Sequence, residues 1–342
     1  MMERALIVAP AWVGDTIMAE PLLARLQEAS PGMEIDALSP AWVAPVFTRM
    51  PEVGHVHLSP FKHGEMALSR RFSLARRLQG YSRAYVLPNS FKAALIPFFA
   101  GIPRRVGFTG EARYGLLNVR HVLDKGVLPR MVERFAQLAE EPGAPLRRPI
   151  PFPRLISTPE QQRTTLRDLG LEENGSAEAP IIFCPGAEYG PAKRWPIEHF
   201  ATLALALSKD GACIWFMGSG RDKILAEAIL ALLPESECVN CRNLCGATRL
   251  EQAIDLIALS RLVVCNDSGL MHIAAALDRP LVALFGSSSP AFTPPLASKA
   301  EVARLNLECS PCFKRKCPLG HLDCLRQLSP EQVLSVCQTQ LV

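Results

Sequence analysis

A polar turn near the start of the last quarter of the chain carries side chains suited to binding an anion. The apolar run Arg261–Cys265 is typical of a buried strand, and the Ala-rich segment Met271–Leu277 is typical of a helix. The turn between them reads Asn-Asp-Ser-Gly and includes Asp267, Ser268 and Gly269, with His272 just inside the helix. Unpaired backbone N–H groups at a helix start favour negative charge, so the turn predicts a phosphate site. A plain capped helix, with Asp267 or Ser268 as the N-cap, is the alternative.

Comparable turns follow other strand-like runs. The run Arg4–Ala9 leads into Pro-Ala-Trp-Val-Gly-Asp, which contains Trp12, Gly14 and Asp15. A Gly/Pro-containing loop carries Lys193 and Arg194, and Asp222 follows Gly218-Ser219-Gly220. Ligands of parallel α/β sheets bind beyond the carboxyl ends of the strands, so these turns hold the candidate binding residues. Neither a G-x-G-x-x-G nor a P-loop pattern is present, which disfavours a dinucleotide dehydrogenase and excludes a P-loop kinase or ATPase.

Strand-like and helix-like segments alternate through both halves of the chain, which predicts parallel βαβ units. The predicted strands are Arg4–Ala9, Glu34–Leu38, Ala84–Leu87, Ile181–Cys184, Ala212–Met217, Leu262–Cys265 and Leu281–Phe285. The predicted helices are Thr16–Glu28, Phe91–Phe99, Ile197–Asp210, Asp222–Leu233, Leu250–Leu259 and Met271–Leu277. A chain of 342 residues exceeds the size of one growing core. The economical fold is therefore α/β, with two doubly wound domains facing each other across a cleft.

Composition and proline content set the expected domain borders and location. We expect an N-terminal domain at residues 1–155 and a C-terminal domain at 156–328. A helix is expected at 329–342, with packing on the N-terminal domain as one alternative for it. The proline-rich stretch 142–159 suits the linker. The sequence contains no run of 18 apolar residues, and its start lacks a basic region and a cleavage site. These features predict a cytoplasmic protein without a membrane span.

Positive charge is concentrated in the first half of the chain. Residues 1–155 contain 20 Lys and Arg against 13 Asp and Glu, although the net charge of the whole chain is +4. The paired arginines are Arg70-Arg71, Arg76-Arg77, Arg104-Arg105 and Arg147-Arg148. A solvated basic surface explains this pattern, and so does an anionic partner such as a membrane or a phosphorylated substrate. Aromatic residues do not alternate with the basic pairs, so nucleic acid is not expected as a partner.

Several of these motifs together resemble one family of enzymes. The shared stretches are Pro10 to Asp15, Cys184 to Pro196, Asn266 to His272 and the cysteine-bearing tail from Cys309 to Cys324. They resemble the bacterial ADP-heptose:lipopolysaccharide heptosyltransferases, which are two-domain glycosyltransferases of the GT-B type. The tail, with Cys-Pro-Leu-Gly-His, is most similar to that of members that add the second heptose of the inner core. Ala11 departs from the Ser that such members often have.

The resemblance implies an inverting sugar transfer. The donor is then ADP-L-glycero-β-D-manno-heptose, and the acceptor is heptosyl-Kdo₂–lipid A, on its first heptose. Transfer to Kdo itself, and nucleotide-sugar binding without catalysis on the same fold, are the alternatives. A lipid-linked acceptor gives the basic half a partner, so we expect peripheral association with the anionic inner face of the cytoplasmic membrane. The residues expected to contact the acceptor or the membrane are Trp12, Gly14, Arg70, Arg71, Arg76, Arg77, Arg104 and Arg105, with the six arginines assigned to the membrane.

The needs of such a transfer assign roles to the candidate residues. Asp15 is the expected general base, with capping of the following helix as the alternative. Lys193, with Arg194, is expected to neutralise the diphosphate, beside the backbone N–H groups of Ser268 and Gly269. Three further side chains complete the predicted donor site: Asp267 for sugar hydroxyls, His272 for phosphate or core packing, and Asp222 for the ribose. Neither a cofactor nor a metal is expected, because a lysine and a helix start can replace a cation.

Four of the eleven cysteines form a separate motif. Cys309, Cys312, Cys317 and Cys324 follow the pattern C-x₂-C-x₄-C-x₆-C, with His321 inside it. Four thiolates are enough for a tetrahedral zinc ion. The spacing differs from that of the common zinc modules, however, and free thiols in a compact loop are the favoured interpretation.

Overall fold

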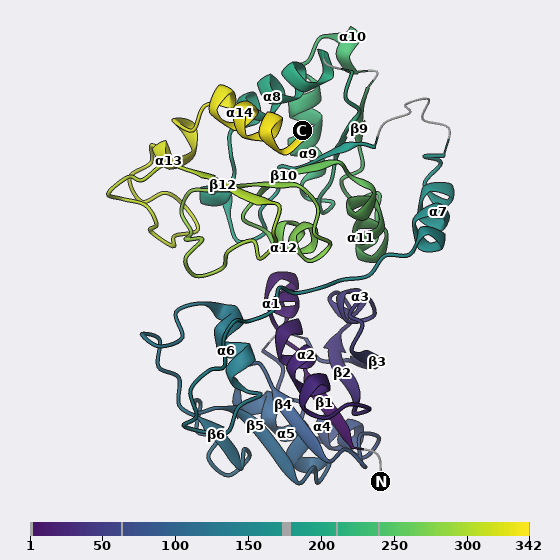
Figure 1. Ribbon diagram of the computed structural model, residues 1–342, viewed down its shortest axis with the longest axis vertical. Helices are drawn as coiled ribbons and strands as arrows, with labels where there is room; N and C mark the ends of the chain where they lie inside the picture. The colour runs from purple at the N-terminus through teal and green to yellow at the C-terminus, as the bar shows by residue number, and fades with distance from the viewer. Residues whose placement is uncertain (1–2, 63, 173–178, 210, 239, 342) are drawn as a thin grey trace. The chain divides into compact units, whose positions relative to one another are not determined.

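The chain folds into two compact α/β units that meet between Leu155 and Ile156 (Figure 1). The computed structural model describes residues 3–62, 64–172, 179–209, 211–238 and 240–341. Between residues 138 and 158, all of which are described, the chain forms no helix or strand. This irregular stretch includes most of the proline-rich segment that the sequence marks as a linker.

The N-terminal unit is built on a parallel sheet with the strand order β3-β2-β1-β4-β5-β6. Its strands are β1 (Arg4–Val8), β2 (Glu34–Pro40), β3 (Val53–Ser59), β4 (Arg83–Val86), β5 (Arg104–Phe108) and β6 (Val119–His121). The central strands are apolar and buried, as expected of a parallel sheet covered on both faces. The first strand, β1, lies between β2 and β4, so the direction of winding reverses beside it.

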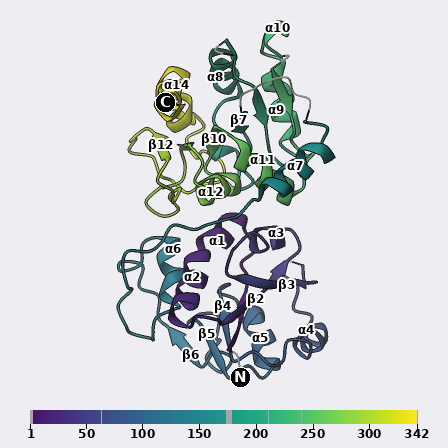
Figure 2. The same ribbon diagram turned by 45° about the vertical axis from the view of Figure 1, so that its right-hand side comes forward.

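Helices cover both faces of this sheet (Figure 2). They are α1 (Val13–Met18), α2 (Glu20–Ala29), α3 (Ala44–Phe47), α4 (Leu68–Ala75), α5 (Phe91–Phe99) and α6 (Met131–Gln137). Helix α6 packs against α1 and α2, whereas α4 packs against α5. The single helix predicted at Thr16–Glu28 is divided at Ala19 and starts earlier, with Trp12 as its N-cap. Asp15 therefore lies in the first turn of α1 and is not its N-cap, which corrects the capping alternative.

The C-terminal unit repeats the same winding with the strand order β12-β11-β10-β7-β8-β9, again parallel throughout. Its strands are β7 (Ile181–Cys184), β8 (Ile214–Phe216), β9 (Cys241–Asn243), β10 (Leu262–Asn266), β11 (Leu281–Phe285) and β12 (Ala300–Arg304). Strand β7 is the first of this sheet and pairs with β10, the fourth. The point where the strand order reverses is therefore flanked by the turns after β7 and β10.

The C-terminal unit contains eight α-helices and one 3₁₀ turn among the described residues. They are α7 (Pro159–Asp168), the 3₁₀ turn η1 (Pro191–Lys193), α8 (Ile197–Lys209), α9 (Lys223–Leu230), α10 (Glu235–Cys238), α11 (Leu250–Leu259), α12 (Gly269–Ala276), α13 (Asp323–Arg326) and α14 (Pro330–Leu341). Helix α8 packs against α9 and α14, and α11 packs against α7 and α12. Val333 and Cys337 of α14 are fully buried in the core of this unit. One face of α14 therefore packs in the core of its own unit, and the expected packing of this helix on the N-terminal domain stays a prediction.

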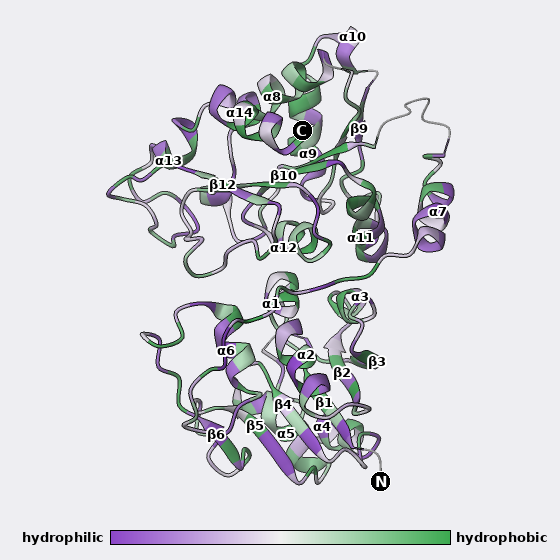
Figure 3. Cartoon of the chain, in the orientation of Figure 1, coloured by the Kyte–Doolittle hydropathy of each residue, from purple (hydrophilic) through white to green (hydrophobic). Residues whose placement is uncertain are grey.

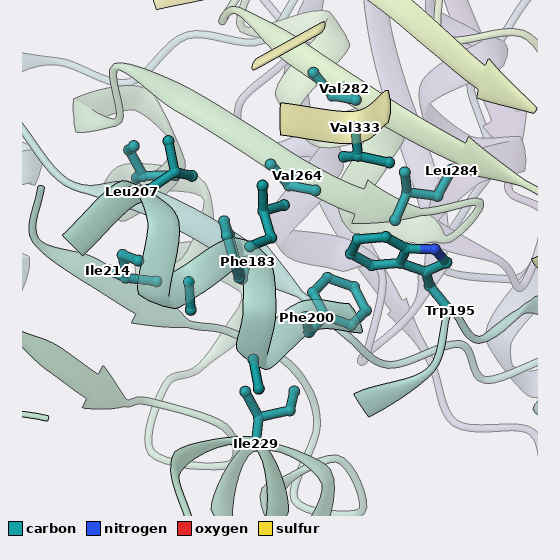
Figure 4. Packing of buried hydrophobic residues seen from close by; sticks show 14 of the residues in the cluster. Phe183, Trp195, Phe200, Leu207, Ile214, Ile229, Val264, Val282, Leu284 and Val333 are labelled. Carbon is teal, nitrogen blue, oxygen red and sulfur yellow. The ribbon is translucent and has the colours of Figure 1, made fainter. Parts of the chain in front are cut away.

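A single apolar cluster joins the strands of the C-terminal sheet to α8, α9 and α14 (Figure 4). The Trp195 ring lies 5.0 Å from that of Phe200, between centroids, and its indole N–H donates to the Leu328 carbonyl at 2.8 Å. Val333 packs beside Leu284 in the same cluster. Burial of these side chains fixes the segment that directly follows Lys193.

Hydropathy follows the layers of the fold. Figure 3 shows hydrophobic residues along β10 and hydrophilic residues along much of α7. Within the described ranges, no helix combines the length and the apolar character that crossing a lipid bilayer requires.

Candidate functional site

An ion pair lies where the strand order of the C-terminal sheet reverses. The Lys193 ammonium, at the end of η1, donates to the Asp267 carboxylate, which directly follows β10. Both side chains are largely buried, with 17% of Lys193 and 5% of Asp267 exposed. The structure thus brings together two residues that the sequence analysis assigned to different parts of the donor. Each group is the counter-ion of the other in this largely buried place.

Asn266 holds the two turns of this site together, and the sequence analysis missed it. Its side chain is fully buried at the end of β10. The side-chain amide nitrogen donates to the Pro185 carbonyl at 2.8 Å, and the side-chain amide oxygen accepts from the backbone N–H of Trp195 at 3.1 Å. Both ends of the loop that carries Lys193 are therefore tied to β10. A polar residue closing an otherwise apolar strand was the signal that could have identified it.

The start of helix α12 has the features of an anion site. Ser268 is its N-cap, but the Ser268 hydroxyl does not cap the helix; it lies 3.3 Å from the Cys265 thiol. Gly269 is the first helical residue, so no side chain covers its backbone. Ser268 thus takes the N-cap position that the capped-helix alternative gave it, and within the described residues no side chain bonds the first N–H groups of α12. Those N–H groups are suited to an anion, whose binding here stays a prediction.

His272 lies one turn into α12 and is a neutral group near pH 7. The residue is 5% exposed, and this burial lowers the pKa of its imidazole to about 4. Asp267 raises that pKa in part, and Lys193 lowers it further. The imidazole can therefore offer an N–H to an acceptor, but it adds no positive charge to the site.

Asp222 braces two strand-end turns. Its carboxylate accepts from the Ser219 N–H at 2.9 Å and from the Ser219 hydroxyl at 2.7 Å. A Cβ atom added at Gly186 would lie 2.3 Å from the Asp222 carboxyl carbon, and one at Gly218 would lie 2.9 Å from its Cβ. These glycines let the carboxylate pack against the turns after β7 and β8. Asp222 thus has internal partners, and its contact with a ribose stays a prediction.

Arg194 is half-buried beside Lys193. Its guanidinium donates to the Ala187 carbonyl of the same loop at 3.4 Å, a long hydrogen bond. The side chain therefore lies close to the candidate site without an ion pair of its own within the described residues.

Asp15 is the acid that the sequence analysis selected in the N-terminal unit. It lies half-buried in the first turn of α1, the helix that follows β1 in the chain. Burial raises the pKa of its carboxyl group to about 6. In the parts of the chain that the structure describes, no ion pair compensates its charge. A carboxyl group with this pKa is half-ionised near pH 6 and can accept a proton at neutral pH.

Aromatic side chains border the turn that holds Asp15. Trp12 and Trp42 are each 53% exposed, and the Trp42 indole donates to the Ala11 carbonyl at 2.8 Å. Gly14 lies between Trp12 and Asp15 in the same turn and is half-buried. Trp12, Gly14 and Asp15, which the sequence analysis selected, therefore stand in one partly open turn.

Two of the six arginines predicted to face a membrane are structural. Arg71 is buried, and its guanidinium donates to the carbonyls of Met66, Lys92 and Glu65 at 2.6, 3.1 and 2.9 Å. Arg105 donates to the carbonyls of Leu116 and Ile102 at 2.7 and 2.6 Å. The prediction of a membrane contact is wrong for Arg71, which is buried, whereas for the half-buried Arg105 it stays a prediction.

The other four predicted arginines keep more of their surface. Arg70 pairs with Glu65 at 2.6 Å and Arg104 pairs with Glu141 at 2.8 Å. Arg76 and Arg77 are exposed just after α4. Arg76 and Arg77 are therefore the arginines that a surface-bound anion could reach without breaking one of these ion pairs.

The four clustered cysteines face one small cavity. Cys309, Cys312, Cys317 and Cys324 line a space of about 20 Å³, together with residues that include Ala192 and Ser287. Burial and the three neighbouring thiols raise the pKa of Cys324 to about 11, whereas backbone N–H groups lower the pKa of Cys317. All four are free thiols. Within the described residues, no group of three or more Cys, His, Asp or Glu is arranged to hold a metal ion.

Comparisons with known proteins agree with the fold and the motifs. The family model of glycosyltransferase family 9 (heptosyltransferase) matches residues 71–323. Lipopolysaccharide heptosyltransferase 2 of Salmonella typhimurium is 46% identical over 339 residues, which is 97% of this chain and 96% of the relative. Lipopolysaccharide heptosyltransferase 1 of Escherichia coli is 26% identical over 313 residues, covering 84% and 89%. The solved structure of E. coli ADP-heptose lps heptosyltransferase II superimposes with a TM-score of 0.88 at 44% identity, covering 99% of this chain and 98% of that one.

Proposed function

The chain belongs to glycosyltransferase family 9, the heptosyltransferases, and we propose that it transfers L-glycero-D-manno-heptose from ADP-heptose to the first heptose of Kdo₂–lipid A. The fold is the two-unit α/β arrangement of the GT-B heptosyltransferases. The observation that carries the proposal is the Lys193–Asp267 pair at the open start of α12. Diphosphate is the part of the donor that such a site is suited to bind.

The second-heptose acceptor is proposed from the pattern of similarity. A relative named heptosyltransferase 2 shares 46% of its residues with this chain, and one named heptosyltransferase 1 shares 26%. The acceptors proposed for the two transfers differ by one heptose. The larger identity therefore favours the acceptor that already carries a heptose.

In the proposed reaction the acceptor hydroxyl oxygen forms a bond to C1 of the heptose while the bond from C1 to the diphosphate oxygen breaks. The hydroxyl proton passes to the Asp15 carboxylate, and attack opposite to the departing ADP inverts the configuration at C1. Asp15 suits this role because its pKa, raised to about 6 by burial, leaves it ionised and basic at pH 7. Its place beside the open Trp12–Gly14 turn leaves room for an acceptor.

Charge on the departing ADP is balanced by the C-terminal unit. The N–H groups at the start of α12, from Ser268 and Gly269 onward, can donate hydrogen bonds to the diphosphate oxygens. They are already oriented by the helix, so the protein need not rearrange as negative charge develops. In this proposal Lys193 supplies a cation, and Asp267, which pairs with it, accepts hydrogen bonds from sugar hydroxyls. Neutral His272 adds an N–H donor. We propose no cofactor and no metal, because cationic side chains and the N–H groups of a helix start can together stabilise a departing diphosphate.

The acceptor lipid also suggests where the enzyme acts. We propose that it works in the cytoplasm, at the inner face of the cytoplasmic membrane, as a peripheral protein. The exposed Arg76 and Arg77 are the residues that support an electrostatic contact with anionic lipid.

A transfer assay with three acceptors tests the proposal. ADP-heptose is offered with core acceptors that carry zero, one or two heptoses, and the products are identified by mass. We expect one heptose to be added to the acceptor that carries one. Addition to the acceptor without heptose would instead assign the chain to the first transfer. Tight ADP-heptose binding with no product on any acceptor would indicate a nucleotide-sugar-binding protein.

A further inference from the structure

The cysteine-bearing segment packs directly against the loop that carries Lys193. The Tyr189 hydroxyl donates to the Phe313 carbonyl at 2.9 Å, and the Ala192 N–H donates to the Arg315 carbonyl at 3.1 Å. Gly190 permits this approach, because a Cβ atom there would lie 2.5 Å from the Arg315 carbonyl oxygen. The backbone at Arg315 is therefore fixed relative to Lys193 by contacts that do not involve the Arg315 side chain.

The two cationic side chains of these segments share one aromatic ring. The Lys193 ammonium lies 5.0 Å from the centroid of the Tyr189 ring, and the Arg315 guanidinium carbon lies 5.2 Å from it. Both distances are within the range of a cation–π interaction. The two charges are thus at most about 10 Å apart, which is about one Debye length in 0.1 M salt. One bound anion can therefore interact with both.

The donor site lacks net positive charge to balance a diphosphate, and Arg315 can supply it. Lys193 is neutralised by Asp267, and His272 is uncharged at neutral pH. A diphosphate brings at least two negative charges to these groups. Arg315 is exposed and forms no ion pair within the described residues. Its guanidinium also has the planar donor pattern that binds phosphate oxygens in pairs.

We propose that Arg315 is a second cationic residue for the diphosphate of the nucleotide-sugar donor, placed beside Lys193 by Tyr189 and the cysteine-bearing segment. The inference rests on the proposed function, since it takes ADP-heptose as the ligand. It gives the cysteine-bearing tail a part in donor binding: the tail carries a phosphate-binding side chain and supports the loop of Lys193.

Substitution of Arg315 leaves the supporting contacts in place, because they use its backbone. We compare the parent enzyme with Arg315→Ala and Arg315→Lys, and use Lys316→Ala as the matched control. Lys316 is the exposed neighbour in the same basic run, so its loss changes the net charge equally. Calorimetry measures the binding of ADP and of adenosine, which has no phosphate, at low and at moderate salt.

We expect Arg315→Ala to weaken ADP binding about tenfold, with Arg315→Lys between it and the parent. Lys316→Ala should stay within about twofold, and adenosine should bind all variants alike. The KM for ADP-heptose should rise by the same factor as the Kd for ADP. Equal ADP affinity in Arg315→Ala and Lys316→Ala would overturn the inference. So would a parallel loss of ADP and adenosine in Arg315→Ala, because it would mean a purely structural role.

The same measurements separate this inference from the proposed function. If the parent protein binds ADP and transfers heptose but Arg315→Ala behaves like the parent, the inference alone fails. If the parent neither binds ADP nor transfers heptose, the proposed function fails and the inference fails with it.

Discussion

The two units share one sheet topology but use their strand-end turns for opposite electrostatic purposes. In the N-terminal unit the turn after the first strand holds Asp15, an acid without an ion pair within the described residues, whose pKa burial raises to about 6. In the C-terminal unit the turn after β10 holds Asp267, an acid that is more deeply buried and paired with Lys193. The unpaired acid is able to take a proton near neutral pH, whereas the paired acid is held by a lysine counter-ion. The partner of each carboxylate, and not the fold, therefore decides its chemistry.

The largest effect should come from removing the proton acceptor. We expect Asp15→Asn to lower kcat by roughly 10²- to 10⁴-fold, since the amide cannot take the acceptor proton. ADP affinity should be unchanged, because the donor residues belong to the other unit. Steady-state kinetics and calorimetry measure the two quantities. Asp124→Asn, an exposed acid of the same unit, is the control. Unchanged turnover in Asp15→Asn would remove Asp15 from the mechanism.

The paired carboxylate should respond to loss of its partner with a loss of stability. Lys193→Met leaves the Asp267 carboxylate buried without a counter-ion, which costs about 3–5 kcal/mol of unfolding free energy. Denaturant unfolding measures this cost. The double variant Lys193→Met/Asp267→Asn should regain most of the stability, while ADP binding stays weak in both variants. If Lys193→Met were as stable as the parent, the Asp267 carboxylate would not depend on Lys193 for its stability in the folded protein.

The pH dependence should distinguish the two sites. Below pH 6 Asp15 binds a proton and can no longer act as a base, so kcat/KM should fall about tenfold for each further pH unit. Above pH 6 the profile should level off. His272, with its pKa lowered to about 4, should not contribute a step between pH 5 and 8. A limb near pH 6 that persists in Asp15→Asn would point to a different titrating group.

The smallest effect concerns the surfaces of the two units. We expect Arg76→Ala/Arg77→Ala to weaken binding to anionic vesicles by about five- to thirtyfold at low salt, since each arginine contributes about 1 kcal/mol. Co-sedimentation with vesicles measures binding, and the difference should vanish at high salt. Arg163→Ala/Arg167→Ala in α7 of the C-terminal unit is the matched control. Equal losses in both pairs would mean that no particular surface is used.

Sequence patterns predicted much of this fold because parallel strands leave strong local signals. The bounds of β7, β11, α5 and α11 were predicted to the residue, since each is an apolar run or an amphipathic segment with clear ends. The break between α1 and α2 was missed although Pro21, at the second position of α2, is a local signal for a helix start. The buried role of Arg71 was missed for a different reason: its acceptors are backbone carbonyls, which every residue has.

The sequence by itself determined the family, the two α/β halves and the turns that carry Asp15, Lys193 and Asp267, because these depend on residue types at short spacing. Tertiary structure alone decided which side chains meet. Lys193 and Asp267 are 74 positions apart, and the Tyr189 hydroxyl reaches Phe313 across 124 positions. Such contacts follow from sheet order and loop docking, which no local pattern encodes. The chemistry of each charged group depends on those distant partners.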